Sequence, residues 1–331
     1  MATANGKIIS LMRIKKQKIA GDASFRTFYR LKLSDKNKII VYAKKEKYKN
    51  LIAYAAINQF LRSNKILAPK LYEHNYSKNI IIIEDFGDLT FNKVLARSRK
   101  KVLIYKELVN LLIKIQKIKT KTKIKSIVSK PHIINKYSIK YLFKESDLFF
   151  DWYLPLFLSK KKSLYIKLKS RKILLKIYKK LNFSNSCFVH RDYHVHNLMR
   201  YEKKVGVIDT QDALIGNPAY DLASLIDDVR IKTSPKLKKQ IYNYYLKNSK
   251  LYKFKSQEFL EDFNILSVQR NLKIVGTFSR LFKRDKKKKY LKLIPYAWKL
   301  LEMRMNSKVF LNLKKVLDIN IPKEIRRTVN R

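Results

Sequence analysis

Three oxygen-bearing side chains, brought close together by two short apolar runs, have the types and spacing of a catalytic centre. Asp192 and Asn197 stand five positions apart, just after the run Cys187–Val189, and Asp209 directly follows Val205–Ile208. Since each run has the character of a short strand, the strand ends should bring these side chains to one point. A carboxylate can accept a hydroxyl proton, while an amide oxygen and a second carboxylate suit magnesium. The pattern indicates phosphoryl transfer from a magnesium-bound nucleotide.

Each of these residues has an expected role. We expect Asp192 to be the catalytic base that aligns and deprotonates the acceptor hydroxyl, and Asn197 and Asp209 to bind Mg²⁺. His190 is expected to hydrogen-bond the loop backbone and so hold Asp192 in place.

A zinc or iron hydrolase is the competing interpretation of the same stretch. His190, His194 and His196, with the two aspartates, resemble a ligand cluster. If residues 193–196 form an extended or turning loop, His194 and His196 cannot easily join His190 on one ion, so we favour the phosphotransferase.

The nucleotide would need contacts from the N-terminal part of the chain. Gly21–Arg26 reads as a tight turn whose backbone N–H groups, with the Ser24 hydroxyl, can approach phosphates. Lys44 or Lys45, on a predicted third strand, could pair with the phosphates. At the end of a later strand, Glu84 is expected to offer backbone groups to adenine and Phe86 a packing surface.

The elements that must position these groups divide into two parts. Up to residue 86 the pattern predicts strand, turn, strand, strand, a helix over 50–63, and two further strands. Beyond residue 87 it is mostly helical, with helices expected over 91–98, 101–118, 164–181, 222–229, 237–246, 259–281, 290–305 and 310–317, and with 119–130 as a loop. We therefore predict an α+β, protein-kinase-like two-lobe fold, with an ATP-binding lobe at 1–86 and a catalytic, substrate-binding helical lobe at 87–331.

The composition indicates the class of protein and the compartment in which it is expected to function. With 46% apolar residues in 331, the chain can bury a large core, and its one cysteine, Cys187, excludes a disulfide framework. We see no secretory signal and no membrane span, since the most apolar run, 148–158, is short, and we expect a cytoplasmic protein. The net charge of +51 is spread over the whole chain, which favours compositional drift, although it should attract anionic ligands and polyanions.

Several stretches together resemble a known family. The loop His190–Asn197 and the strand end Ile208–Asp212 are similar to motifs of the aminoglycoside phosphotransferase and choline kinase superfamily. Closer still is the resemblance to the anomeric N-acetylmuramate/N-acetylglucosamine kinases of bacterial cell-wall recycling. It is carried by GDASFRTFYRL at 21–31, IIEDFGD at 82–88, FFDWYL at 149–154, the stretch from HRDYHVHNLM to IDTQDALIGNPAYDLASLIDD, and QRNLKIVGTFSRLFKRDKKKKYLKLIP at 269–295.

The resemblance implies an ATP- and Mg²⁺-dependent kinase that makes a sugar 1-phosphate, acting as a monomer on a small-molecule sugar, without specific nucleic acid. Arg270, Arg280 and Arg284 are candidates for contacting the lactyl carboxylate of N-acetylmuramate. Two alternatives stay open: another hydroxyl kinase of aminoglycoside or choline type, and a catalytically dead kinase scaffold that binds nucleic acid. The intact Asp192, Asn197 and Asp209 argue against the scaffold.

Overall fold

The computed structural model describes residues 16–19, 26–34, 36–43, 48–128, 130–249 and 255–327. These residues form two compact units. The first unit contains the described residues up to Asn135 together with His190–Leu214, and the second contains Lys136–Val189 and the described residues from Ile215 onward. All described residues predicted for catalysis and cofactor binding belong to the first unit.

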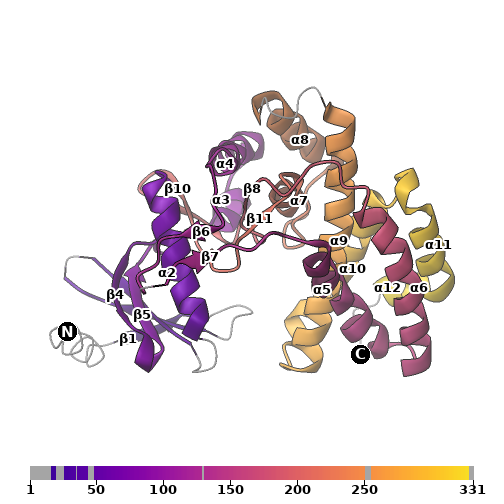
Figure 1. The fold of residues 1–331 in the computed structure, drawn as a ribbon, viewed down its shortest axis with the longest axis horizontal. Helices are drawn as coiled ribbons and strands as arrows, with labels where there is room; N and C mark the ends of the chain where they lie inside the picture. Colours follow the sequence, from indigo (N-terminus) through magenta and orange to yellow (C-terminus); the bar gives the residue numbers. More distant parts are fainter. Residues whose placement is uncertain are drawn as a thin grey trace. The chain divides into compact units, whose positions relative to one another are not determined.

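An antiparallel five-stranded sheet dominates the first unit (Figure 1). Its strands are β1 (Lys16–Ile19), β2 (Thr27–Leu31), β3 (Lys38–Tyr42), β4 (Leu71–Asn75) and β5 (Ile80–Glu84), in the spatial order β1-β2-β3-β5-β4. Helix α2 (Tyr48–Ser63) packs against one face through Leu51 and Tyr54, as the apolar spacing over 50–63 predicted.

Strand β5 shows why the sheet needs cover on both faces. Its run of four isoleucines is fully buried, because Ile81 and Ile83 cluster with α2 while Ile80 and Ile82 face a second cluster around Leu31 and Ile40. A strand buried on both faces reads as a continuous apolar run instead of an alternating one.

The remaining elements of the first unit carry the catalytic segment. They are the helices α3 (Phe91–Arg97) and α4 (Lys101–Gln116), a small ladder of β6 (Lys123–Ile124) with β7 (His132–Ile133), and the hairpin of β9 (Leu198–Tyr201) with β10 (Lys204–Val207). The ladder shows that part of the segment predicted as a loop, 119–130, pairs as a strand.

The second unit is mainly helical. Its main elements are α5 (Ile139–Leu148), a π-helical turn (Phe149–Tyr153), α6 (Lys160–Tyr178), β8 (Cys187–Val189) paired with β11 (Leu214–Gly216), α7 (Ala219–Ile226), α8 (Pro235–Ser249), α9 (Ser256–Lys283), α10 (Ile294–Arg304), α11 (Leu311–Asn320) and α12 (Lys323–Arg327). The predicted fold class is thereby confirmed. Among the helices in the described ranges, none is long and apolar enough to cross a membrane.

Helix α9 is the centre of the second unit, packed against α5, α7, α10 and the π-helical turn. Gly276 allows α9 to pack closely against the backbone of Leu148 and Phe149, because a Cβ atom at this position would overlap that backbone. The aromatic cluster of Phe149, Tyr153 and Trp298 fills the core on this side, so the apolar run over 148–158 contributes to the core of the second unit.

Candidate active site

The loop that carries Asp192 is held by its own backbone. The Asp192 carbonyl accepts from His194 N at 2.9 Å, and the His194 carbonyl accepts from Asn197 N at 2.8 Å. From α3, Asn92 N donates to the Val195 carbonyl at 3.0 Å. These bonds make the loop a compact turn that holds the half-buried Asp192 in a defined place.

His190 connects this loop to the end of β10. Its Nε2 lies 2.9 Å from the Ile208 carbonyl, which can only accept, and Asp192 N donates to its Nδ1 at 3.3 Å. Both bonds are satisfied together by the neutral imidazole with the proton on Nε2. The expectation that His190 hydrogen-bonds the loop backbone is confirmed.

The same bonds bear on the metallohydrolase interpretation. Because both ring nitrogens of His190 are engaged with backbone groups, this side chain offers no lone pair for joining His194 and His196 on one ion. The three-histidine site that the sequence allowed is therefore not formed in this arrangement.

Asn197 directly precedes β9 and Asp209 lies two residues after β10, so both residues are at the same end of the β9–β10 hairpin. Ile208 N donates to the Asn197 carbonyl at 3.0 Å, and Asn197 Nδ2 donates to the Asp192 carbonyl at 3.0 Å. With its amide nitrogen used in this way, Asn197 offers its amide oxygen as a ligand atom. An amide oxygen and a carboxylate together are a donor set that fits Mg²⁺, whose binding here stays a prediction.

Asp209 has an uncommon backbone conformation. Its φ is +65°, in the left-handed region that a non-glycine residue seldom adopts. Such conformations concentrate at functional sites, where surrounding contacts maintain them. Here the next residue supplies one such contact, because Thr210 Oγ1 donates to Asn58 Oδ1 of α2 at 2.6 Å.

A buried arginine from the N-terminal part of the chain contacts Asp209. Arg26, just before β2, forms an ion pair with Asp209 Oδ1, and its Nη1 donates to Gln211 Oε1 at 2.7 Å. Sequence reasoning assigned Arg26 no role beyond closing the predicted phosphate turn. The available signal was its position: a cation two residues after Ser24.

The predicted adenine-binding residues lie around the end of β5. Glu84 Oε2 accepts from Arg62 Nη1 at 3.2 Å and from Lys70 N at 3.0 Å, and its Oε1 accepts from the Tyr201 hydroxyl at 3.2 Å. Its carboxylate is thus committed to neighbouring groups, which is compatible with the expectation that its backbone, and not its side chain, serves a ligand.

Phe86 is packed between two residues of the β9–β10 hairpin. Its ring stacks on Tyr201 with centroids 4.5 Å apart, and it also lies close to Gly206, where a Cβ would lie 2.6 Å from the Phe86 Cε2. This packing fixes the Phe86 ring within the first unit. Contact with adenine stays a prediction, and Ser24, Lys44 and Lys45 lie outside the described residues.

Residues 16–254 match the phosphotransferase enzyme family. The chain belongs to this family. It is a phosphotransferase with a hydroxyl acceptor, as the sequence predicted.

Among curated relatives, this phosphotransferase is 25% identical over 288 residues to an N-acetylmuramate/N-acetylglucosamine kinase of Neisseria meningitidis, covering 83% of the chain and 81% of the relative. It is 26% identical to a kinase of that name from Pseudomonas aeruginosa, covering 86% and 81%. Of solved structures, choline kinase LicA from Streptococcus pneumoniae aligns with a TM-score of 0.62 at 14% identity, covering 91% of this chain and 98% of the other. ADP-bound aminoglycoside phosphotransferase APH(2'')-Ib aligns with a TM-score of 0.59 at 14% identity, covering 91% and 97%. Similarity at this level shows the fold.

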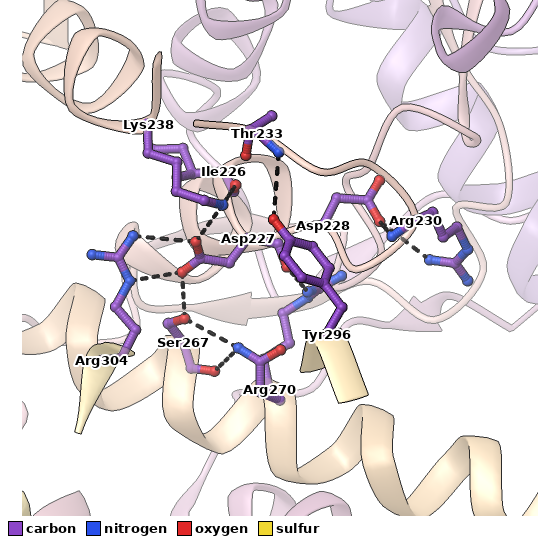
Figure 2. Close-up of polar contacts among 11 residues, drawn as sticks. Ile226, Asp227, Asp228, Arg230, Thr233, Lys238, Ser267, Arg270, Tyr296 and Arg304 are labelled. Atoms are coloured by element: carbon purple, nitrogen blue, oxygen red, sulfur yellow. Dashed lines mark hydrogen bonds and ion pairs between the residues drawn. The ribbon is translucent and has the colours of Figure 1, made fainter. Parts of the chain in front are cut away.

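The second unit of the phosphotransferase contains a buried charge cluster centred on Asp227, at the end of α7 (Figure 2). Asp227 pairs with Lys238 of α8 at 2.9 Å and with Arg304 of α10 at 2.8 and 3.2 Å, and it accepts from Ser267 Oγ of α9 at 2.6 Å. Burial raises the pKa of the Asp227 carboxyl, but the charges of Lys238 and Arg304 outweigh it and hold this pKa at about 2.

This cluster includes one of the arginines proposed for a sugar carboxylate. Arg270 is 2% exposed and donates to the Asp227 carbonyl at 3.3 Å, which gives it a structural contact. Arg284 pairs with the adjacent Asp285 at 2.7 Å. Burial and the neighbouring Arg284 lower the pKa of Arg280. Their contact with substrate stays a prediction.

Proposed function

We propose that the protein is an ATP- and Mg²⁺-dependent kinase that phosphorylates the anomeric hydroxyl of N-acetylmuramate or N-acetylglucosamine. The observation that carries the chemistry is the hydrogen-bonded connection of Asp192, Asn197 and Asp209 through His190 and Ile208. The acceptor is inferred from the curated relatives, whose names specify these two sugars over about four fifths of their length.

In the proposed reaction, Asp192 holds the acceptor hydroxyl in line with the γ-phosphorus and takes its proton. The sugar oxygen forms the new P–O bond while the bond to the β-phosphate oxygen breaks, releasing ADP. Asn197 and Asp209 would hold Mg²⁺, which supplies charge neutralisation on the phosphates. His190 hydrogen-bonds both the Asp192 backbone and the Ile208 carbonyl after β10, and so holds these two segments together.

The charge of the chain supports an anionic or neutral acceptor. A cationic aminoglycoside would need an acidic pocket, whereas a chain with net charge +51 favours the carboxylate of N-acetylmuramate. We therefore place the amino sugars before aminoglycosides and choline as acceptors.

The test is phosphorylation of a defined panel of acceptors by purified protein with MgATP. The panel contains N-acetylmuramate, N-acetylglucosamine, gentamicin and choline, and phosphorus NMR identifies the phosphorylated position. We expect a sugar 1-phosphate. Phosphate on another hydroxyl, or on gentamicin or choline alone, would contradict the proposed acceptor.

A matched pair of variants tests the catalytic base. Asp192→Asn should lower kcat by about 10²–10⁴-fold, because the amide cannot take the hydroxyl proton, while ATP still binds. Glu202→Gln, in the exposed turn between β9 and β10, is the control and should leave kcat unchanged. An Asp192→Asn variant with full activity would show that the base is another group.

A further inference from the structure

Arg26 is a buried cation whose contacts converge on the end of β10. The residue is 7% exposed, and its guanidinium is bonded to the carboxylate of Asp209 and to the side-chain oxygen of Gln211. These partners lie 183 and 185 positions further along the chain. The contact therefore joins the start of β2 to the segment predicted to bind the metal.

Two aromatic rings hold the guanidinium in this position. Its carbon lies 5.6 Å from the ring centroid of Phe28 on β2 and 5.8 Å from that of Tyr54 on α2. Both distances are within the range of cation–π attraction. Since α2 also contacts Thr210 through Asn58, two elements of the first unit, β2 and α2, fix Arg26 and residues 209–211 against one another.

The chemistry of this position suits a phosphate contact. A guanidinium is planar and permanently charged, and its N–H groups match the oxygens of phosphate as well as those of a carboxylate. A carboxylate that binds magnesium in a kinase holds an ion that also binds nucleotide phosphates. A cation hydrogen-bonded to that carboxylate lies next to the same phosphates.

We propose that Arg26 is a phosphate-binding residue of this kinase, contacting the polyphosphate of ATP beside Asp209. The proposal rests on the proposed function, because it requires that the first unit bind ATP. It assigns to a residue just before β2 the electrostatic task predicted for Lys44, and it adds fixed positive charge where the transferred phosphate carries negative charge.

The experiment is a ligand-truncation series measured without magnesium. Dissociation constants for ATP, ADP, AMP and adenosine are measured by calorimetry in EDTA for the wild type and for Arg26→Gln. If Arg26 contacts the polyphosphate, Arg26→Gln weakens ATP and ADP binding by about 10–100-fold, as expected for a charge-assisted hydrogen bond, and changes adenosine binding less than twofold.

Two results would overturn the proposal. Equal weakening of adenosine and ATP binding would show that Arg26 only supports the pocket. Unchanged ATP binding in EDTA, with a loss confined to magnesium-containing buffer, would show that Arg26 only positions Asp209.

Two further variants make the outcome decisive. Arg200→Gln removes another arginine of the first unit, which pairs with Glu107 at 2.6 and 2.7 Å, and it should change none of the four constants. If Arg26→Gln does not fold, Arg26→Lys keeps the charge and loses the planar fork, and a several-fold loss for ATP with unchanged adenosine binding is expected. Unchanged ATP binding by a folded Arg26→Lys would count against the proposal.

The binding series also separates this proposal from the proposed acceptor. A wild-type protein that binds ATP but phosphorylates no amino sugar would contradict the acceptor and leave the role of Arg26 to be decided by the truncation series. A wild-type protein that binds no adenine nucleotide would overturn both.

Discussion

Removing the negative charge of Asp227 should destabilise the second unit strongly. The Asp227 side chain is 1% exposed and lies between the Lys238 ammonium and the Arg304 guanidinium. In the variant Asp227→Asn the amide cannot neutralise these two cations, which would then face each other in a buried environment. Removing one partner of a buried ion pair lowers the free energy of unfolding by about 3–5 kcal/mol. We expect the lower end of this range because the Arg304 side chain is partly exposed to solvent.

The assay is denaturant-induced unfolding followed by circular dichroism, with midpoints compared between wild type and variants. Asp285→Asn is the matched control, since its pair with Arg284 is solvent-exposed and should contribute less than about 1 kcal/mol. A loss for Asp227→Asn no larger than that for Asp285→Asn would refute the reasoning. Adding Lys238→Met to Asp227→Asn should recover part of the loss, because it removes one uncompensated charge.

The pH dependence follows from the lowered pKa of Asp227. The folded protein holds this pKa at about 2, below the ordinary value of 3.8, so folding favours the charged carboxylate. The stabilisation is complete above about pH 4 and is lost as the pH falls toward 2, an effect of about 2.5 kcal/mol. The stability difference between wild type and Asp227→Asn should shrink over that range, and a constant difference would contradict the assignment.

Three further changes test the packing around the site and the core. Gly206→Val should displace the Phe86 ring and weaken adenosine binding several-fold in calorimetry; unchanged affinity would count against adenine packing on Phe86. Gly276→Ala should cost about 2–3 kcal/mol in unfolding experiments, since α9 must move away from the backbone of Leu148 and Phe149; a neutral result would exclude that close approach. Burial raises the pKa of the Cys187 thiol, so iodoacetamide should label it only after denaturation; rapid labelling of the folded protein would contradict this burial.

Local patterns in the sequence predicted most of the first unit. The apolar spacing over 50–63 identified α2, and the two further strands predicted before residue 87 correspond to β4 and β5. The interval from Asp192 to Asn197 and the apolar run before Asp209 indicated the chemistry, because both depend only on neighbouring residues.

Helix α5 shows where local reasoning failed. Its buried face includes Glu145 and Ser146, so the segment does not show a clean apolar stripe. Glu145 is tolerated there because Gln269 donates to it at 3.0 Å and Lys273 pairs with it at 3.1 Å, both from α9. These partners lie more than 120 positions away, and no window around α5 contains them.

The sequence by itself thus determined the class of reaction and the identity of the residues on the Asp192 loop, since strand periodicity and short spacing are encoded locally. Only the tertiary structure decided which cation meets Asp209. In a chain with 76 lysines and arginines, residue type alone could not single out Arg26. The choice is made by the sheet and α2, which bury that guanidinium beside Asp209, where it needs a counter-charge that the distant β10 end supplies.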